Sequence, residues 1–175
     1  MTVPMHVTAF PTSVRVGGLA KSELLHSLRG RRVCFNEAAE KLFQDPRFTP
    51  KSRIETVQIA FRSVGSLGLR NGATYERLIA RAAESGLTEC PLELGPHLRL
   101  QYWNQPDAGG GLATPGKAPA GSITVASQWL DDSDDTPKGF YLLRSRGARW
   151  LRAYWTSSDY VWAVDDVMVF SLGSG

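Results

Sequence analysis

The chain has 175 residues, a net charge of +3 and an isoelectric point near 9.0. Hydrophobic residues make up 42% of it and charged residues 21%, which are ordinary values for a globular protein and exclude a fibrous or low-complexity chain. This mild positive charge permits contacts with nucleic acid or acidic partners, but it does not indicate a dedicated nucleic-acid binder.

The two cysteines, Cys34 and Cys90, cannot build a disulfide framework, and neither belongs to a CxxC pair. We therefore expect reduced, mostly packed thiols, as in a reducing compartment. Residues 1–19 lack the basic and apolar regions of a secretory signal, and no apolar run approaches the ~18 residues that span a bilayer. These features predict a cytoplasmic protein with no membrane segment.

The N-terminal half predicts an arm followed by helices and one strand. Residues 1–20 contain two prolines and a glycine pair, so we expect an extended N-terminal arm with an edge strand at 13–16. Apolar stripes at helical spacing predict three helices, in the stretches 21–30, 35–48 and 74–86. Pro46 ends the second of them. Between the last two, residues 53–64 alternate as a half-buried strand does.

After Gly86 the apolar period changes to two. The pattern predicts strands at 97–103, 122–130, 139–145, 149–155 and 166–172. Residues 107–121 form a Gly/Ala/Pro-rich stretch that predicts a flexible loop, and Arg146-Gly147 is short enough for a tight hairpin. The prediction is one α+β domain over 21–175, with N-terminal helices packed on one face of a mainly antiparallel C-terminal β-sheet.

Three stretches give the chain a particular signature: "LGLRNGATYERLIARAAESGLTECPLELGPHLRLQY", "RWLRAYW" and the terminal "VMVFSL". Together they resemble a family of small bacterial proteins that has no assigned function. The resemblance covers residues 33–172 and is most specific from Gly72 to Gln105, and the Gly109–Gly121 loop looks like an insertion. It implies a soluble bacterial α+β protein and transfers no catalytic residue.

The first candidate site is the strand predicted at 97–103. Its alternation places four side chains on one face, namely His97, Arg99, Gln101 and Trp103. An imidazole, a guanidinium and an amide in a row could bind an anionic or hydrogen-bonding ligand. The same pattern is typical of the solvent-facing side of an antiparallel sheet. The second interpretation is favoured, although it leaves an exposed Trp103 unexplained.

The second candidate site is the strand predicted at 149–155. Trp150, Arg152 and Tyr154 share one face, which could offer stacking and cationic contacts to a ligand or partner. Trp150 and Tyr154 could equally fill the core, and Trp155, on the opposite face, is predicted to be a core residue.

Two charged stretches are further candidate sites. Asp131, Ser133 and Asp135 have the spacing of a calcium loop, but Thr136 replaces the required Gly and Leu142 the bidentate Glu. We therefore expect a solvated acidic turn, with no metal and no cofactor. Three arginines at the end of the first helix could contact phosphate, namely Arg29, Arg31 and Arg32. A solvated helix end is the simpler interpretation.

Three functional hypotheses follow. The first is a non-enzymatic bacterial binding protein that presents an aromatic and arginine-bearing sheet face to a protein partner or small ligand. The second is a small hydrolase or transferase that uses Cys90 or His97 with Arg99, because a thiol beside an imidazole can act as a nucleophile. The third, less favoured, is a weak nucleic-acid binder.

Overall fold

The computed structural model describes residues 9–110 and 118–173. The helices of this part are α1 (Lys21–Gly30), α2 (Glu37–Gln44), α3 (Tyr75–Glu84) and α4 (Leu94–Gln101), with a 3₁₀ turn η1 (Gly65–Leu67). The strands are β1 (Ser13–Val16), β2 (Cys34–Phe35), β3 (Glu55–Ser63), β4 (Ala73–Thr74), β5 (Leu87–Thr88), β6 (Ile123–Val125), β7 (Gly139–Ser145), β8 (Ala148–Tyr154), β9 (Val161–Trp162) and β10 (Val167–Leu172).

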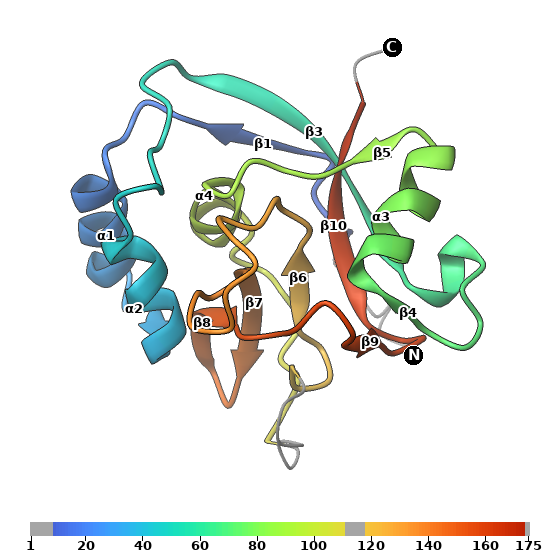
Figure 1. Cartoon of the computed structure of the whole chain (residues 1–175). Helices are drawn as coiled ribbons and strands as arrows, with labels where there is room; N and C mark the ends of the chain where they lie inside the picture. Colours follow the sequence, from blue (N-terminus) through green and yellow to red (C-terminus); the bar gives the residue numbers. More distant parts are fainter. Residues whose placement is uncertain (1–8, 111–117, 174–175) are drawn as a thin grey trace, which may run out of the picture.

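Eight of these strands form one strongly curled sheet (Figure 1). Its order is β1-β3-β10-β6-β7-β8-β2, and β5 pairs with the end of β10. The pairs are antiparallel except β10 with β6 and β8 with β2. The fold is therefore α+β with a mostly antiparallel sheet, and β4 and β9 form a small second sheet beside it.

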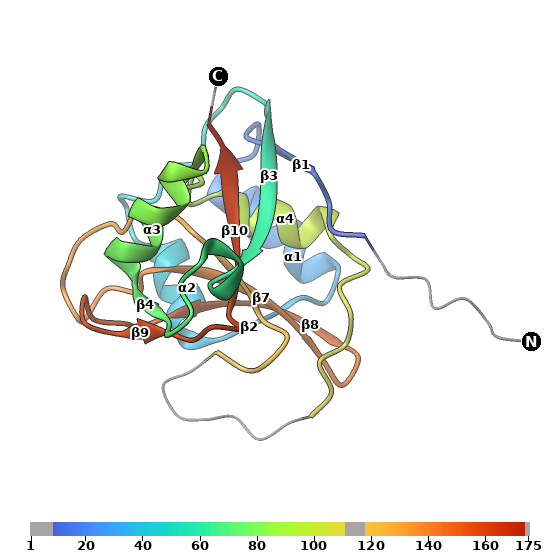
Figure 2. The same cartoon turned by 90° about the vertical axis from the view of Figure 1, so that its right-hand side faces the viewer.

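Two hydrophobic cores lie on opposite faces of the sheet. On the concave face, α1, α2 and α4 cover a core in which Phe140 packs against Phe43 and Phe48, with ring centroids 5.4 and 6.0 Å apart. On the other face, α3 covers Met168 and Phe170 of β10. Figure 2 shows α3 and α4 on opposite sides of β10. Alternate residues of one strand thus serve different cores.

Much of the predicted element order is confirmed. The predicted helices correspond to α1, α2 and α3, and the edge strand at 13–16 is β1. The predicted hairpin joins β7 to β8, where Ser145 pairs with Ala148. Of the strand predicted at 122–130, only β6 forms. Within the loop predicted at 107–121, residues 111–117 lie outside the described part of the chain.

Two fold predictions are wrong. The helices are interleaved with the strands and lie on both faces of the sheet, because α3 and α4 connect strands instead of preceding them. The strand predicted at 97–103 is also wrong, because residues 94–101 form helix α4. Leu94, Leu98 and Tyr102 recur every four residues and make one buried face. Within the helices of the described residues, no segment is long and apolar enough to cross a membrane.

A backbone contact at Gly17 gives a first prediction. Gly17 has φ +88°, and a Cβ there would lie 2.0 Å from the Arg53 carbonyl oxygen. Gly86 has φ +73° with open space around it. We expect Gly86→Ala to lower the free energy of unfolding by about 1–2 kcal/mol, the cost of a left-handed residue. Gly17→Ala should cost at least about 3 kcal/mol, because overpacking is added.

Urea denaturation of both variants measures the difference. Equal losses of stability would show that the chain near Arg53 moves aside at little cost, contrary to this packing.

Candidate functional site

His97, Arg99 and Gln101 were predicted to share one strand face, but in helix α4 their side chains point in different directions. His97 and Gln101 are four residues apart and face β1, whereas Arg99 points to the opposite side of the helix. Gln101 forms two hydrogen bonds with the Arg15 backbone: Oε1 accepts from its N–H at 3.0 Å and Nε2 donates to its carbonyl at 2.7 Å. His97 Nε2 accepts from the Gly17 N–H at 3.2 Å. Both side chains therefore fasten the edge strand to the helix.

Arg99 is completely buried and fastens the chain after α4. Its guanidinium donates to Gln105 Oε1 at 2.6 Å and to the Tyr102 carbonyl at 2.5 Å. Gln105 in turn donates to the carbonyls of Gly121 and Leu142. Burial, aided by Arg149 and Arg144, lowers the pKa of Arg99 to about 10. Arg99 is thus a structural cation, and its described contacts offer no open anion clamp.

Trp103 is half-buried and lies among arginines. The Arg149 Cζ is 4.1 Å from the centroid of the Trp103 ring, and that of Arg31 is 5.6 Å away. Arg149 Nε also donates to the Trp103 carbonyl at 2.9 Å, and Arg31 Nη1 donates to that of Leu100. These cation–π contacts account for an aromatic side chain at this surface. Arg29 and Arg32 are exposed nearby in sequence.

Cys90 and His97 make separate contacts. The Cys90 thiol is buried, and its Sγ lies 3.6 Å from the Val169 carbonyl oxygen. His97 Nε2 lies near Gly17 and, at 3.7 Å, near Glu93 Oε2. Burial, with a smaller effect of Glu89, raises the pKa of Cys90 to about 12. The structure therefore does not assemble the nucleophile and base that a Cys90–His97 enzyme needs.

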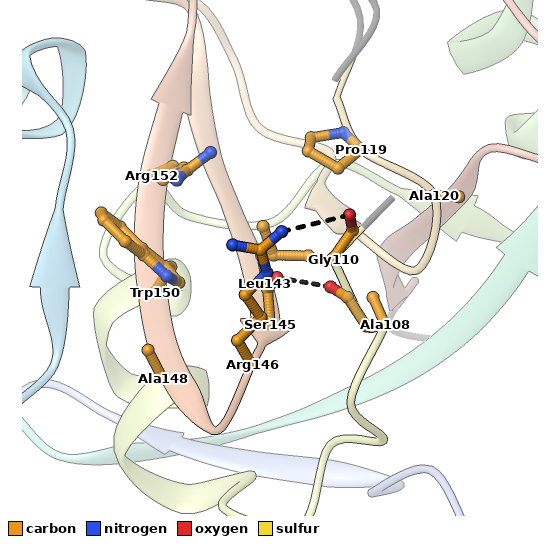
Figure 3. A pocket seen from close by; sticks show the side chains of 11 residues that line it. Ala108, Gly110, Pro119, Ala120, Leu143, Ser145, Arg146, Ala148, Trp150 and Arg152 are labelled. Atoms are coloured by element: carbon orange, nitrogen blue, oxygen red, sulfur yellow. Dashed lines mark hydrogen bonds between the residues drawn. The ribbon is translucent and has the colours of Figure 1, made fainter. Parts of the chain in front are cut away.

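A cavity of about 380 Å³ lies on the outer face of the β7–β8 hairpin (Figure 3). One wall is the hairpin itself, and the other is formed by the segments 108–110 and 119–120, which lie beside it. The lining residues are Ala108, Gly109, Gly110, Pro119, Ala120, Leu143, Ser145, Arg146, Ala148, Trp150 and Arg152. Two of the residues predicted as a site, Trp150 and Arg152, thus face one hollow.

The chemistry of the cavity comes from two arginines and an indole. Arg152 lies over the Trp150 ring, with its Cζ 4.1 Å from the ring centroid. Its Nε is buried and has no hydrogen-bond partner among the described residues. Arg146 Nη2 makes a long hydrogen bond of 3.5 Å to the Gly110 carbonyl. Among the described lining residues there is no carboxylate, so nothing in this wall neutralises the two guanidinium groups.

The remaining predicted aromatics lie elsewhere. Tyr154 ends β8 and packs edge-to-face on Trp162 in the second core, with centroids 5.3 Å apart, and burial raises the pKa of its phenol. The prediction that Trp155 is a core residue is wrong: it is 42% exposed, with Lys41 Nζ 4.9 Å from its ring centroid. Trp155 follows the last residue of β8, so the strand's alternation no longer applies to it.

Arg146 and Asp107 were missed by the sequence analysis. Arg146 and Gly147 form the hairpin turn with φ of 50° and 78°. Asp107 holds this turn, because its Oδ1 accepts from the Arg146 N–H at 3.1 Å and its Oδ2 from the Gly147 N–H at 2.7 Å. The two-residue turn was recognised, but an arginine at a left-handed position is a signal that only the dihedral angles reveal.

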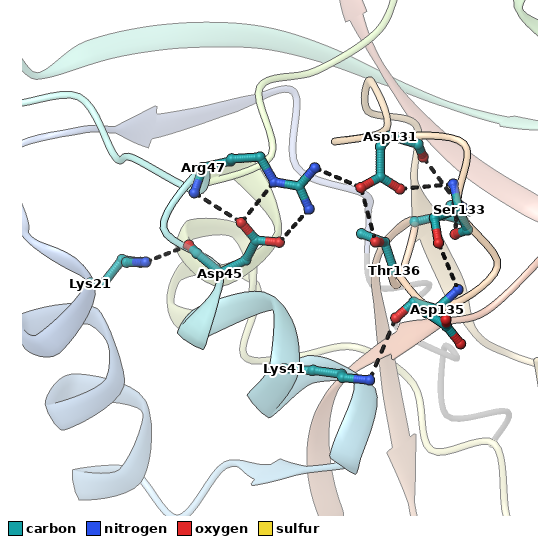
Figure 4. Close-up of polar contacts among 9 residues, drawn as sticks. Lys21, Lys41, Asp45, Arg47, Asp131, Ser133, Asp135 and Thr136 are labelled. Atoms are coloured by element: carbon teal, nitrogen blue, oxygen red, sulfur yellow. Dashed lines mark hydrogen bonds and ion pairs between the residues drawn. The ribbon is translucent and has the colours of Figure 1, made fainter.

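In the acidic turn at 131–136, the oxygen atoms of Asp131 and Ser133 bind lysine and arginine side chains of the same chain. Lys138 is buried, and its Nζ donates to the carbonyls of Asp131 and Ser133 at 3.0 and 2.6 Å. Arg47 bridges the carboxylates of Asp45 and Asp131 (Figure 4). Its hydrogen bond holds the pKa of both carboxyls below their usual range. Within the described residues no group of three or more His, Cys, Asp or Glu side chains is placed to hold a metal ion.

Comparison of the chain with family models, curated proteins and solved structures finds no match. The resemblance to a bacterial family therefore stays a prediction.

The buried thiol gives a second prediction. In a Cys34→Ser variant, we expect Cys90 to react with a disulfide reagent at pH 8 at least about a hundredfold more slowly than a free thiol, since so little of it is thiolate. An unfolded chain ionises this thiol near its ordinary pKa of 9.0, whereas the folded chain keeps it neutral up to about 12. Its contribution to stability is therefore present below pH 9 and is lost as the pH rises toward 12.

Absorbance stopped-flow in native buffer and in denaturant measures the two rates. A native rate equal to the denatured rate would contradict the burial of this thiol and restore it as a candidate nucleophile.

Proposed function

We propose that the protein is a non-enzymatic binding protein that takes a small organic anion with a flat group into the β7–β8 cavity. The observation that supports this most directly is the convergence of Arg146, Arg152 and Trp150 on one hollow whose described lining contains no carboxylate. Guanidinium groups form charge-assisted, bidentate hydrogen bonds with carboxylates and phosphates, and they stack on flat groups.

The arrangement of charge favours an anion. The Arg152 side chain makes no hydrogen bond or ion pair with another described residue, and it stacks on the Trp150 ring. The stack holds the side chain in one orientation, so less entropy is lost when a ligand is bound. A cavity of about 380 Å³ lies within the range of small-molecule sites, roughly 300–1,000 Å³.

The shape of the face favours a small ligand over a protein partner. Trp150 lies at the wall of a concave hollow and Tyr154 is committed to the second core, so the strand offers no open aromatic surface. The hydroxyl of Ser145 already donates to the Gly109 carbonyl at 2.5 Å. The described lining contains no histidine, cysteine or carboxylate that could act as a general base, which favours binding over catalysis.

The test compares anionic and neutral probes. By isothermal titration calorimetry at pH 7.5, we expect the protein to bind benzoate and phenyl phosphate but not benzyl alcohol. Arg152→Gln should weaken both anions at least about tenfold, because a charge-assisted hydrogen bond contributes ~1.5–3 kcal/mol. Trp150→Leu should weaken them less, because the guanidinium remains but loses its support.

Arg77→Gln is the matched control, since Arg77 is an exposed arginine of α3 outside the cavity lining. It removes one charge and should leave both affinities unchanged. The proposal is wrong if the wild-type protein binds neither anion, or if Arg152→Gln binds them as tightly as Arg77→Gln does.

A further inference from the structure

We propose that the anionic group recognised in this cavity is a phosphate monoester, and that Arg146 is the residue that selects it over a carboxylate. This inference rests on the proposed function and names the chemistry of its ligand.

The two guanidinium groups reach the cavity from different parts of the hairpin. Arg152 projects from strand β8, and Arg146 projects from the turn and lies back over the hairpin toward Gly110 (Figure 3). A carboxylate has two oxygens in one plane, which a single guanidinium fork can satisfy. A phosphate monoester has three terminal oxygens around a tetrahedral centre and carries nearly two negative charges at pH 7. Two forks that approach from different directions therefore match the phosphate better.

The backbone of Arg146 is the second observation. Its φ of 50° is unusual for a residue with a side chain, and the first position of such a turn favours Asn, Asp or Gly. The turn gains little from the arginine side chain, whose described polar contact is the 3.5 Å bond to Gly110. Asp107 nevertheless holds this conformation through the backbone N–H groups of both turn residues. Strained residues that their surroundings hold in place are a feature of ligand clamps.

The rest of the wall suits the ester group. Leu143, Ala148, Pro119 and Ala120 supply apolar surface next to the Trp150 indole. A bare phosphate ion would leave this surface without a partner, and a cavity of about 380 Å³ has room for a flat group beside the phosphate. We therefore assign the ligand to the class of phosphate monoesters of flat, ring-bearing molecules.

The decisive variant is Arg146→Asn, because asparagine suits the turn and removes only the guanidinium. For the wild type we expect calorimetry at pH 7.5 to give at least tenfold tighter binding of phenyl phosphate than of benzoate or inorganic phosphate. In Arg146→Asn, phenyl phosphate should bind at least tenfold more weakly and benzoate at most threefold more weakly. The midpoint of thermal unfolding should stay the same or rise, so that a folding defect is excluded.

The outcomes separate this inference from the proposed function. If benzoate binds as tightly as phenyl phosphate, or if Arg146→Asn keeps the preference, the phosphate assignment is wrong while anion binding stands. If inorganic phosphate binds as tightly as phenyl phosphate, the flat ester group is not recognised and that part of the assignment is wrong. If no probe binds, both proposals are wrong.

Discussion

The structure depends on side-chain amides that hydrogen-bond to the backbone where the curled sheet lacks neighbouring strands. A sheet that curls without closing leaves backbone N–H and C=O groups at its ends, and these need partners. At one end Gln101 bonds both groups of Arg15 in β1. At the other end Asn36 accepts from the Ala153 N–H at 3.0 Å and donates to its carbonyl at 2.9 Å, next to the two-residue strand β2. Each pair of bonds takes the place of the hydrogen bonds that a neighbouring strand would make at that residue.

This edge arrangement determines where the cavity lies. Gln101 and Asn36 tie α4 and the start of α2 to the ends of the sheet, and α1 lies with them on its concave face. Helix α3 covers the opposite face only around β10. The outer face of β7 and β8 is left to the short segments 108–110 and 119–120, which touch it without filling the space. The cavity is therefore a consequence of how the helices are distributed.

The sequence predicted those parts in which local pattern and tertiary environment agree. The alternation of β8 predicted that Trp150 and Arg152 share one face, and in the structure both line the cavity while Leu151 and Ala153 lie in the core on the other side. Helix α4 was missed because its eight residues fit a period of two as well as a period of four. Pro96 is compatible with the helix because it lies in the first turn, where a missing N–H costs no hydrogen bond. It precedes the strand predicted at 97–103, so it did not argue against that strand either.

Only the part of the cavity that lies on one strand could be predicted from the sequence. Trp150 and Arg152 belong to one strand, so alternation alone brings them together. Arg146 and Asp107 are 39 residues apart in sequence, and they meet because hydrogen bonds such as that from the Ala108 N–H to the Arg144 carbonyl align the segment with the hairpin. No local pattern encodes a contact of this kind. His97 and Arg99 lie apart because a helix separates side chains that a strand would have aligned.

Asp107 also distinguishes the two faces of the hairpin, because its carboxylate lies beside the arginines of only one of them. Arg144 and Arg149 are opposite each other across β7 and β8 on the concave face, a like-charge pair that alone would destabilise the hairpin. The N–H groups of Gly147, Gly109 and Arg146 hold the pKa of Asp107 below its usual range, so it is ionised at neutral pH, and it lies 3.9 Å from Arg144 Nε. Its charge therefore offsets the concave-face pair. Asp107 fixes the turn through backbone groups and does not line the cavity, so no carboxylate of the described lining pairs with Arg146 or Arg152 on the outer face.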